Sequence, residues 1–136
     1  MSAPKFRVVI ADDEFHSREF LKALINTMNG EVVGEATTGV EAVDLYTKLR
    51  PHLLLMDVNM PIMTGDEALQ EIKEKHPDAF VIMMSAVADR NHVKKCFALG
   101  ASHYIRKDTP LMEIKRIIKE AWEHMARSKP RGQKPA

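Results

Sequence analysis

Five short apolar runs alternate with segments of helical periodicity along most of this chain. The runs cover residues 6–11, 32–36, 53–56, 80–84 and 104–105. Each has the length and the β-branched content of a buried strand. In the segments between them, and in the segment after the last run, apolar residues recur three and four positions apart. This alternation predicts an α/β fold, in which a five-stranded parallel sheet carries helices on both faces, five helices in all.

Several residues mark where the helices are expected to begin and end. Thr38 with Glu41 and Thr64 with Glu67 each have the spacing of a capping box. Thr109 followed by Pro110 predicts a cap and a first-turn proline for the last helix. Gly30 and Gly100 are placed to end the first and fourth helices.

Length and charge indicate one domain with a short tail. The chain has 136 residues, 20 basic and 19 acidic side chains and a single Cys. We expect residues 1–126 to form the domain and residues 127–136, basic and without large apolar side chains, to be a disordered tail. The tail is too short for a helix-turn-helix and has no aromatic residue, so direct nucleic-acid binding is not expected.

The length of the apolar runs and the single Cys indicate the cellular compartment. No apolar run approaches the ~20 residues of a membrane span, so we expect no membrane association. The lone Cys96 suits a reducing compartment, and we expect a cytoplasmic protein in which Cys96 is a small buried hydrophobe.

Polar side chains follow four of the five predicted strands. Asp12 and Asp13 follow the first strand, Asp57 the third, Ser85 the fourth and Lys107 the fifth. Binding sites in such sheets form at the carboxyl ends of the strands. Each residue alone could be a helix cap or a turn residue. Together, the carboxylates would repel by about 3 kcal/mol per pair at ~5 Å and an effective dielectric of ~20. A divalent cation would remove that cost, and oxygen ligands with open positions suit Mg²⁺ and phosphoryl chemistry.

The order and spacing of these residues resemble a known family. Asp12-Asp13, the stretch DVNMPIMTG from Asp57, Ser85-Ala86 and the stretch GASHYIRK that ends at Lys107 are similar to the receiver domain of bacterial two-component response regulators. The resemblance runs from about residue 6 to residue 125. It implies a doubly wound, flavodoxin-like sheet with strand order 2-1-3-4-5.

The resemblance also implies a set of chemical roles. Asp57 would accept a phosphoryl group from the phosphohistidine of a sensor histidine kinase or phosphotransfer protein. Asp13, Asp57 and the backbone carbonyl of Asn59 would hold Mg²⁺, with Asp12 acting through a water. Lys107 would pair with Asp57 and then, with the Ser85 hydroxyl, contact the phosphoryl group. Such a domain is a signalling phosphoacceptor that assists its own phosphotransfer and dephosphorylation.

The same resemblance implies how the signal leaves the site. Tyr104 would turn inward when Ser85 moves toward the phosphoryl group. That movement would reshape the face formed by the fourth helix, fifth strand and fifth helix, which would meet a downstream target or effector domain that the sequence does not identify.

Two positions depart from the family pattern. Asp108 follows Lys107 where the family has proline after a cis peptide, and cis before a non-proline residue costs ~2.5 to 4 kcal/mol. The peptide bond between Lys107 and Asp108 is therefore expected to be either trans or a strained cis bond. Val87, two residues after Ser85, offers no base to a water and predicts slow dephosphorylation. The six histidines show no metal-ligand spacing.

Two other functions share part of this residue pattern. A phosphatase of the haloacid-dehalogenase type also uses an Asp nucleophile and Mg²⁺, but it needs a second Asp where this chain has Asn59. An interaction module that is never phosphorylated would have no need for the full set of strand-end residues.

Overall fold

The computed structural model of this chain describes residues 6–86 and 89–128. It has the five strands and five helices that the alternation predicts. The strands are β1 (Phe6–Ala11), β2 (Gly30–Ala36), β3 (Leu53–Asp57), β4 (Val81–Ser85) and β5 (His103–Arg106). The helices are α1 (Phe15–Thr27), α2 (Gly39–Leu49), α3 (Gly65–Lys75), α4 (Arg90–Ala98) and α5 (Leu111–Ser128). None of these helices is long and apolar enough to cross a membrane.

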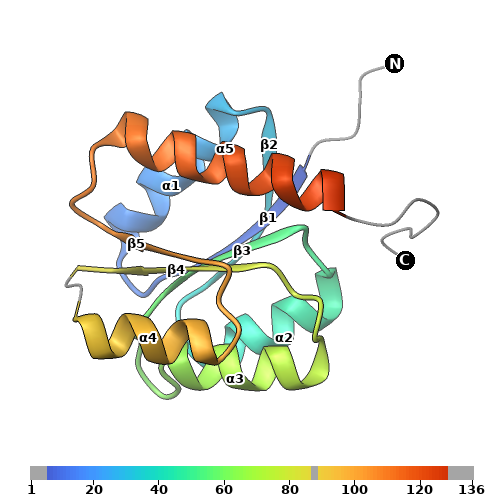
Figure 1. Ribbon diagram of the computed structural model, residues 1–136, viewed down its shortest axis with the longest axis vertical. Coiled ribbons are helices and arrows are strands. Elements are labelled where there is room, and N and C mark those ends of the chain that lie inside the picture. The colour runs from blue at the N-terminus through green and yellow to red at the C-terminus, as the bar shows by residue number, and fades with distance from the viewer. Residues whose placement is uncertain (1–5, 87–88, 129–136) are drawn as a thin grey trace.

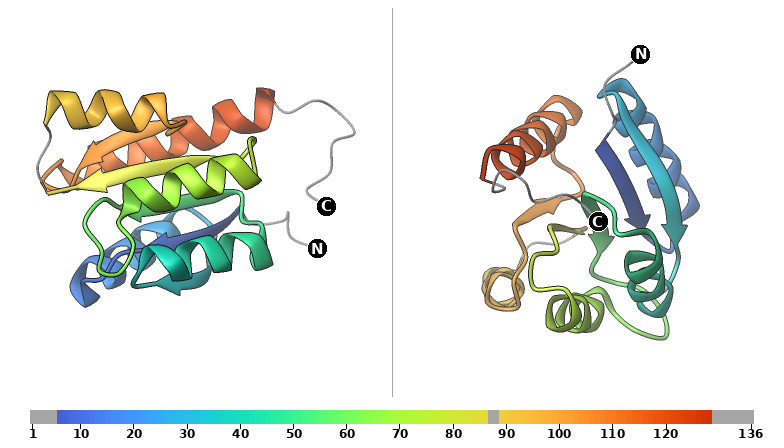
Figure 2. Two further views of the ribbon diagram at one scale, coloured as in Figure 1. Left: turned by 90° about the horizontal axis from the view of Figure 1, so that it is seen from below. Right: turned by 90° about the vertical axis from the view of Figure 1, so that its right-hand side faces the viewer.

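The sheet is doubly wound, as predicted. All four strand pairs are parallel and the order is β2-β1-β3-β4-β5. Helices α1 and α5 cover one face, and α2, α3 and α4 cover the other (Figures 1 and 2). Successive side chains of a strand point to opposite faces, so Leu54 and Met56 join the core under α2–α4 while Leu53 and Leu55 join the core under α1 and α5. Both faces of the central strands are therefore buried.

The helix signals were correct in part. Thr64 and Glu67 form the predicted reciprocal capping box at the start of α3. The Thr38 hydroxyl caps α2, but the Glu41 carboxylate accepts hydrogen bonds from Thr37 instead, so the second predicted box is not reciprocal. Helix α5 begins at Leu111, so Pro110 precedes it.

The predicted stop at Gly30 is wrong. Helix α1 ends at Thr27, and Asn29 takes the left-handed backbone conformation (φ 61°) that follows a helix end. Gly30 instead begins β2, where a Cβ atom would lie 2.7 Å from Ile25 and 2.9 Å from the ring of Phe6. Gly100 fills its predicted role after α4, with φ 108°.

The predicted tail falls largely outside the described residues. Helix α5 includes residues 127 and 128, and residues 129–136 are not described. Cys96 is fully buried in the core under α2–α4, as expected for a small apolar side chain.

Candidate functional site

Three carboxylates lie together at the carboxyl edge of the sheet. Asp57 is the last residue of β3, and Asp12 and Asp13 follow β1 directly. Their ligand atoms lie within 4.8 Å of one another. Asp57 and Asp12 are only 6% and 1% exposed, whereas Asp13 faces solvent. Two of the three negative charges are therefore removed from water.

The Lys107 ammonium group brings the opposite charge to this cluster. Its backbone amide donates to the carbonyl of Ser85 at 2.7 Å, which fixes the β5–α5 loop beside β4. Its Nζ lies 2.7 Å from Asp12 Oδ2 and 3.4 Å from Asp57 Oδ2. Lys107 thus contacts Asp57, the partner that the resemblance implied, but its nearer partner is Asp12. The Lys107–Asp108 peptide is trans, as are all peptide bonds among the described residues.

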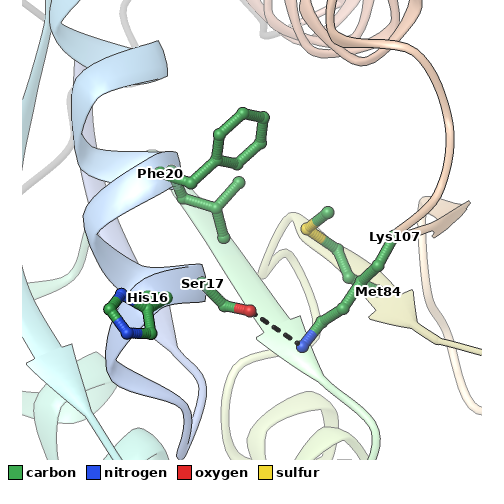
Figure 3. Close-up of a pocket in the computed structure, with 6 residues that line it drawn as sticks. His16, Ser17, Phe20, Met84 and Lys107 are labelled. Atoms are coloured by element: carbon green, nitrogen blue, oxygen red, sulfur yellow. Dashed lines mark hydrogen bonds between the residues drawn. The ribbon is translucent and has the colours of Figure 1, made fainter.

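The Lys107 side chain reaches the cluster along the first turns of α1. Its Nζ also lies 3.5 Å from the Ser17 hydroxyl, and Met84 and Phe20 line the apolar pocket above it (Figure 3). Lys107 therefore lines this pocket together with apolar side chains, while its ammonium group faces the carboxylates.

Burial and charge act against each other on Asp57. Burial is the largest cause and raises the pKa of the Asp57 carboxyl to about 6, and the Asp12 charge adds to this. Lys107 and the backbone amide of Asn59 act in the opposite direction. Burial alone lowers the pKa of Lys107, but its hydrogen bond to Asp12 and the charges of Asp12 and Asp57 raise it overall. The single ammonium group of Lys107 therefore does not neutralise the cluster of three carboxylates, which keeps an excess of negative charge.

This donor set fits Mg²⁺. All three side chains offer carboxylate oxygens, which are the ligands that this hard cation prefers, and exposed Asp13 leaves one side open to water. Cations also lower the pKa of nearby carboxylates, so a divalent ion would favour the ionised form of Asp57 that burial disfavours.

The loop after β3 holds Asp57 in place. The Gly65 amide donates to the Val58 carbonyl at 2.8 Å. A Cβ atom on Gly65 would lie 2.2 Å from the Asp57 carbonyl oxygen, so only glycine fits this position. The capping box of Thr64 and Glu67 then starts α3 at once. The motif DVNMPIMTG is therefore a tight return from the strand end to a helix.

Ser85 and Tyr104 connect this edge of the sheet to α4. Ser85 is buried at the end of β4 and hydrogen-bonds to the Tyr104 hydroxyl. Tyr104 is half-buried on β5, packs on the core under α2–α4, and lies 3.0 Å from His92 Nδ1 on α4. Ala86 is exposed beside Ser85, and Val87 lies outside the described residues.

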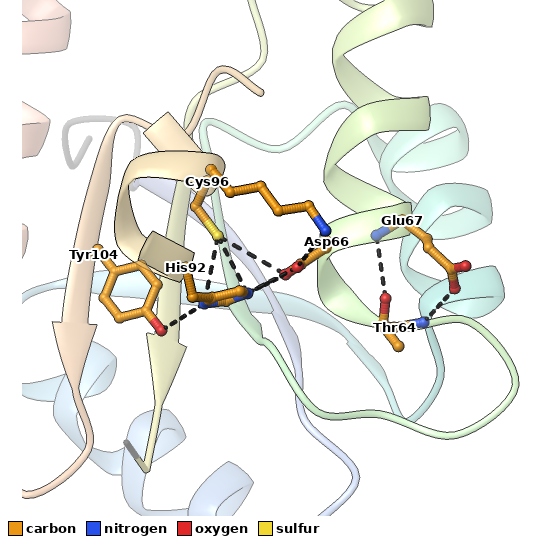
Figure 4. A network of polar contacts seen from close by, with 7 residues as sticks. Thr64, Asp66, Glu67, His92, Cys96 and Tyr104 are labelled. Carbon is orange, nitrogen blue, oxygen red and sulfur yellow. Dashed lines mark hydrogen bonds and ion pairs between the residues drawn. The ribbon is translucent and has the colours of Figure 1, made fainter. Parts of the chain in front are cut away.

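A second cluster of metal-ligating groups lies at the α3–α4 contact. Asp66, His92 and Cys96 place their ligand atoms within 4.8 Å of one another (Figure 4). The sequence showed no metal-ligand spacing at any histidine, but the fold brings His92 together with Asp66 and Cys96. His92 and Cys96 are four residues apart on α4 and so share one face of that helix, a spacing that the sequence analysis did not consider. Asp66 comes from a different helix, and no local spacing could have identified it.

Comparison with known proteins places this geometry in a family. The family model for the response regulator receiver domain matches residues 8–119. The chain is 41% identical over 101 residues to the chemotaxis protein CheY of Thermotoga maritima, which covers 74% of this chain and 84% of that protein. It is 38% identical over 109 residues to the uncharacterized transcriptional regulatory protein YhcZ of Bacillus subtilis, which covers 79% of this chain and 51% of YhcZ. The chain thus spans about half the length of that relative.

The fold agrees with solved structures of the same kind. A chain in the crystal structure of the CheX–CheY–BeF3–Mg complex from Borrelia burgdorferi superposes with a TM-score of 0.83 at 28% identity, and the match covers 86% of this chain and 89% of that one. The matched residues contain the whole acidic edge, from Asp12 to Lys107. The chain belongs to the response regulator receiver domain family, the signalling domains of two-component systems.

Proposed function

We propose that this domain accepts a phosphoryl group on Asp57 from a histidine kinase or a phosphotransfer protein, with Mg²⁺ bound at the acidic edge. The observation that carries the proposal is the position of Asp57. Its buried carboxylate ends β3 within reach of both an ammonium group and two further carboxylates. Asp44 on α2 is an exposed carboxylate that, among the described residues, forms its ion pair with Lys48 of its own helix and lies outside the cluster of Asp12, Asp13 and Asp57.

The residues would divide the chemistry as follows. A carboxylate oxygen of Asp57 attacks the phosphorus, the bond from phosphorus to the donor imidazole nitrogen breaks, and an aspartyl phosphate forms. Bound Mg²⁺ would supply positive charge to the phosphoryl oxygens, held by Asp13, Asp57 and the Asn59 carbonyl, with Asp12 acting through a water. Lys107, already 3.4 Å from Asp57, donates to a second phosphoryl oxygen.

Ser85 and Tyr104 would report the change. A phosphoryl group on Asp57 offers a new acceptor to the Ser85 hydroxyl, which now hydrogen-bonds to Tyr104. Loss or redirection of that bond alters the contact of Tyr104 with His92 on α4. We infer that the face of α4, β5 and α5 meets the downstream target.

The pKa of about 6 keeps Asp57 largely ionised above neutral pH, as a nucleophile requires.

Incubation with acetyl phosphate and Mg²⁺ tests the proposal. We expect the intact protein to gain the mass of one phosphoryl group, and peptide mapping to place it on Asp57. Asp57→Asn should remain unlabelled, while Asp44→Asn, the matched exposed control, should label like the parent. Label on another residue, undiminished label in Asp57→Asn, or no label at all with Mg²⁺ present would contradict the proposal; the last result would favour an interaction module.

A further inference from the structure

The contact between α3 and α4 brings together three side chains that the phosphorylation chemistry does not use. His92 Nε2 lies 2.9 Å from Asp66 Oδ1 and 2.7 Å from Oδ2. Cys96 Sγ lies 3.8 Å from Asp66 Oδ1 and 3.8 Å from His92 Nε2. One sulfur, one imidazole nitrogen and one carboxylate oxygen therefore form a triangle (Figure 4).

The size of this triangle is close to that of a tetrahedral zinc site. Zinc bonds of ~2.0 Å to nitrogen or oxygen and ~2.3 Å to sulfur hold ligand atoms about 3.3 to 3.6 Å apart. The two distances from sulfur, to His92 Nε2 and to Asp66 Oδ1, exceed this by a few tenths of an ångström, and the 2.9 Å distance from Nε2 to the same Oδ1 is too short by a similar amount. Insertion of a cation would separate His92 from Asp66, whose side chains are 22% and 14% exposed and can rotate.

The chemistry of the donors selects the metal. A thiolate and an imidazole favour Zn²⁺ over the hard Mg²⁺ expected at the acidic edge. The thiol would release its proton to solvent, and the two negative ligands would balance the charge of the ion. A site with no net charge suits a partly buried location. Solvent reaches the site beside His92, so a water can take the fourth position.

The surroundings of His92 already match those of a zinc-binding histidine. Such an imidazole binds the metal through one nitrogen and donates from the other to an outer partner. Here Nε2 faces Asp66, and Nδ1 lies 3.0 Å from the Tyr104 hydroxyl. Cys96 Sγ lies beside the ring, 3.8 Å from Nε2 and 4.0 Å from Nδ1, so its side chain must rotate toward Nε2 to share an ion with it. The exposed Lys95 ammonium group, 3.5 Å from Asp66 Oδ2, is the cation that now offsets the Asp66 charge. We propose that Asp66, His92 and Cys96 form a Zn²⁺-binding site in this domain.

Zinc titration of the full chain tests this site without any phosphodonor. Excess Mg²⁺ occupies the acidic edge, and a chromophoric chelator competes for Zn²⁺. We expect one zinc ion per chain, and in a parallel experiment with Co²⁺ the charge-transfer band of a thiolate–cobalt bond. Cys96→Ser and His92→Gln should each weaken Zn²⁺ binding by at least roughly a hundred-fold, more than loss of an outer partner. His124→Gln, which removes an exposed histidine of α5, should bind like the parent.

The outcomes separate a metal site from a structural contact. Zinc binding that is unchanged in both ligand variants, absence of the cobalt–thiolate band, or failure of the parent to compete with the chelator would each overturn the proposal. Circular dichroism shows whether Cys96→Ser is folded. If it is not, His92→Gln decides the question, because the His92 side chain is partly exposed. None of these results depends on phosphorylation of Asp57.

Discussion

At the scale of single residues, the function proposed for Asp57 works against the stability of the fold. A carboxylate that is 6% exposed has lost most of its hydration, and one ammonium group shared with Asp12 replaces only part of it. The result is a pKa of about 6, above the ordinary value of 3.8. The folded protein therefore binds this proton more tightly than the unfolded chain does.

We expect Asp57→Asn to be more stable than the parent in metal-free buffer above pH 7. The shift of about two pKa units corresponds to roughly 3 kcal/mol of destabilisation by the ionised carboxylate. The sign is opposite to that of a salt-bridged Asp, because the folded pKa is raised. The advantage of Asn should shrink as the pH falls through 6 and should be lost only below the ordinary pKa of 3.8, where Asp57 is protonated in both the folded and the unfolded chain.

Denaturant melts with a chelator at pH 8, 6 and 4.5 would measure this difference. Asp44→Asn, a change at an exposed carboxylate, should follow the parent at each pH. Equal stability of Asp57→Asn and the parent at pH 8 would show that the buried, ionised Asp57 carboxylate does not destabilise the fold.

Ile62, in the loop between Asp57 and α3, has a strained backbone conformation. Its φ is 72° and its side chain is 84% exposed, so it combines a left-handed backbone with no apolar burial. A β-branched residue is a true outlier there, and the left-handed conformation costs an L-residue ~1 to 2 kcal/mol. We expect Ile62→Asn to raise the unfolding free energy by about 1 kcal/mol, because Asn tolerates this conformation.

Thermal melts of Ile62→Asn and Ile62→Val would check the cause. Val keeps the β-branch and should leave the melting temperature near that of the parent. A gain in Val as large as that in Asn would rule out backbone strain as the reason.

At the scale of elements, two helices begin with glycines that pack against the site. A Cβ atom on Gly39, at the start of α2, would lie 2.4 Å from the carbonyl oxygen of Met63. Gly65, at the start of α3, approaches the Asp57 carbonyl even more closely, at 2.2 Å. Both contacts are with backbone atoms of the β3–α3 segment, which cannot move aside as a flexible side chain can.

Gly65→Ala should therefore reverse the usual effect of this substitution. In an ordinary helix Ala is better than Gly by about 1 kcal/mol. Here the clash should lower the unfolding free energy by about 2 kcal/mol or more. Gly34→Ala is the matched control, because its Cβ atom would meet only the side-chain tips of Leu49 and Leu45 at 3.0 and 3.4 Å. Denaturant melts in which both variants lose the same stability would contradict the argument.

Elements could be predicted from the sequence where the signal is local. The apolar runs identified all five strands, and the pairing of Thr64 with Glu67 identified the start of α3, because both depend on neighbours in the chain. Gly30 was misassigned because its small size is required by Phe6, a residue of another strand. Strand β5 was underestimated at residues 104–105, because the polar His103 and Arg106 complete its pairing with β4.

The site residues also differ in whether the sequence alone could predict their grouping. The positions of Asp12, Asp13 and Asp57 at strand ends follow from the order of apolar runs, so the sequence could place them together. The closer pairing of Lys107 with Asp12 depends on the path of the β5–α5 loop and could not be read from spacing. The grouping of Asp66 with His92 and Cys96 depends on how α3 packs against α4, which no single segment encodes.

At the scale of the whole molecule, the parallel sheet brings distant residues to one edge. Asp12 and Lys107 form a 2.7 Å contact although 95 positions separate them in the chain. Every strand contributes its carboxyl end to the same side, so charged groups can meet there while the core stays apolar. The acidic edge exists only in the folded state, and an ion that binds there must therefore stabilise the whole domain.

This coupling gives a prediction for Mg²⁺. At a concentration ten times its dissociation constant, Mg²⁺ should raise the unfolding free energy by about 1.4 kcal/mol, because it binds the assembled edge and not the unfolded chain. Asp13→Asn should lose this gain. Unlike Asp57, Asp13 faces solvent, so its replacement should change the stability of the metal-free protein little. Denaturant melts of the parent, Asp13→Asn and Asp44→Asn, each with a chelator and with Mg²⁺, would show the difference. If Asp13→Asn gained as much from Mg²⁺ as the parent and the Asp44→Asn control, the ion would be acting elsewhere, and the three carboxylates would not form its site.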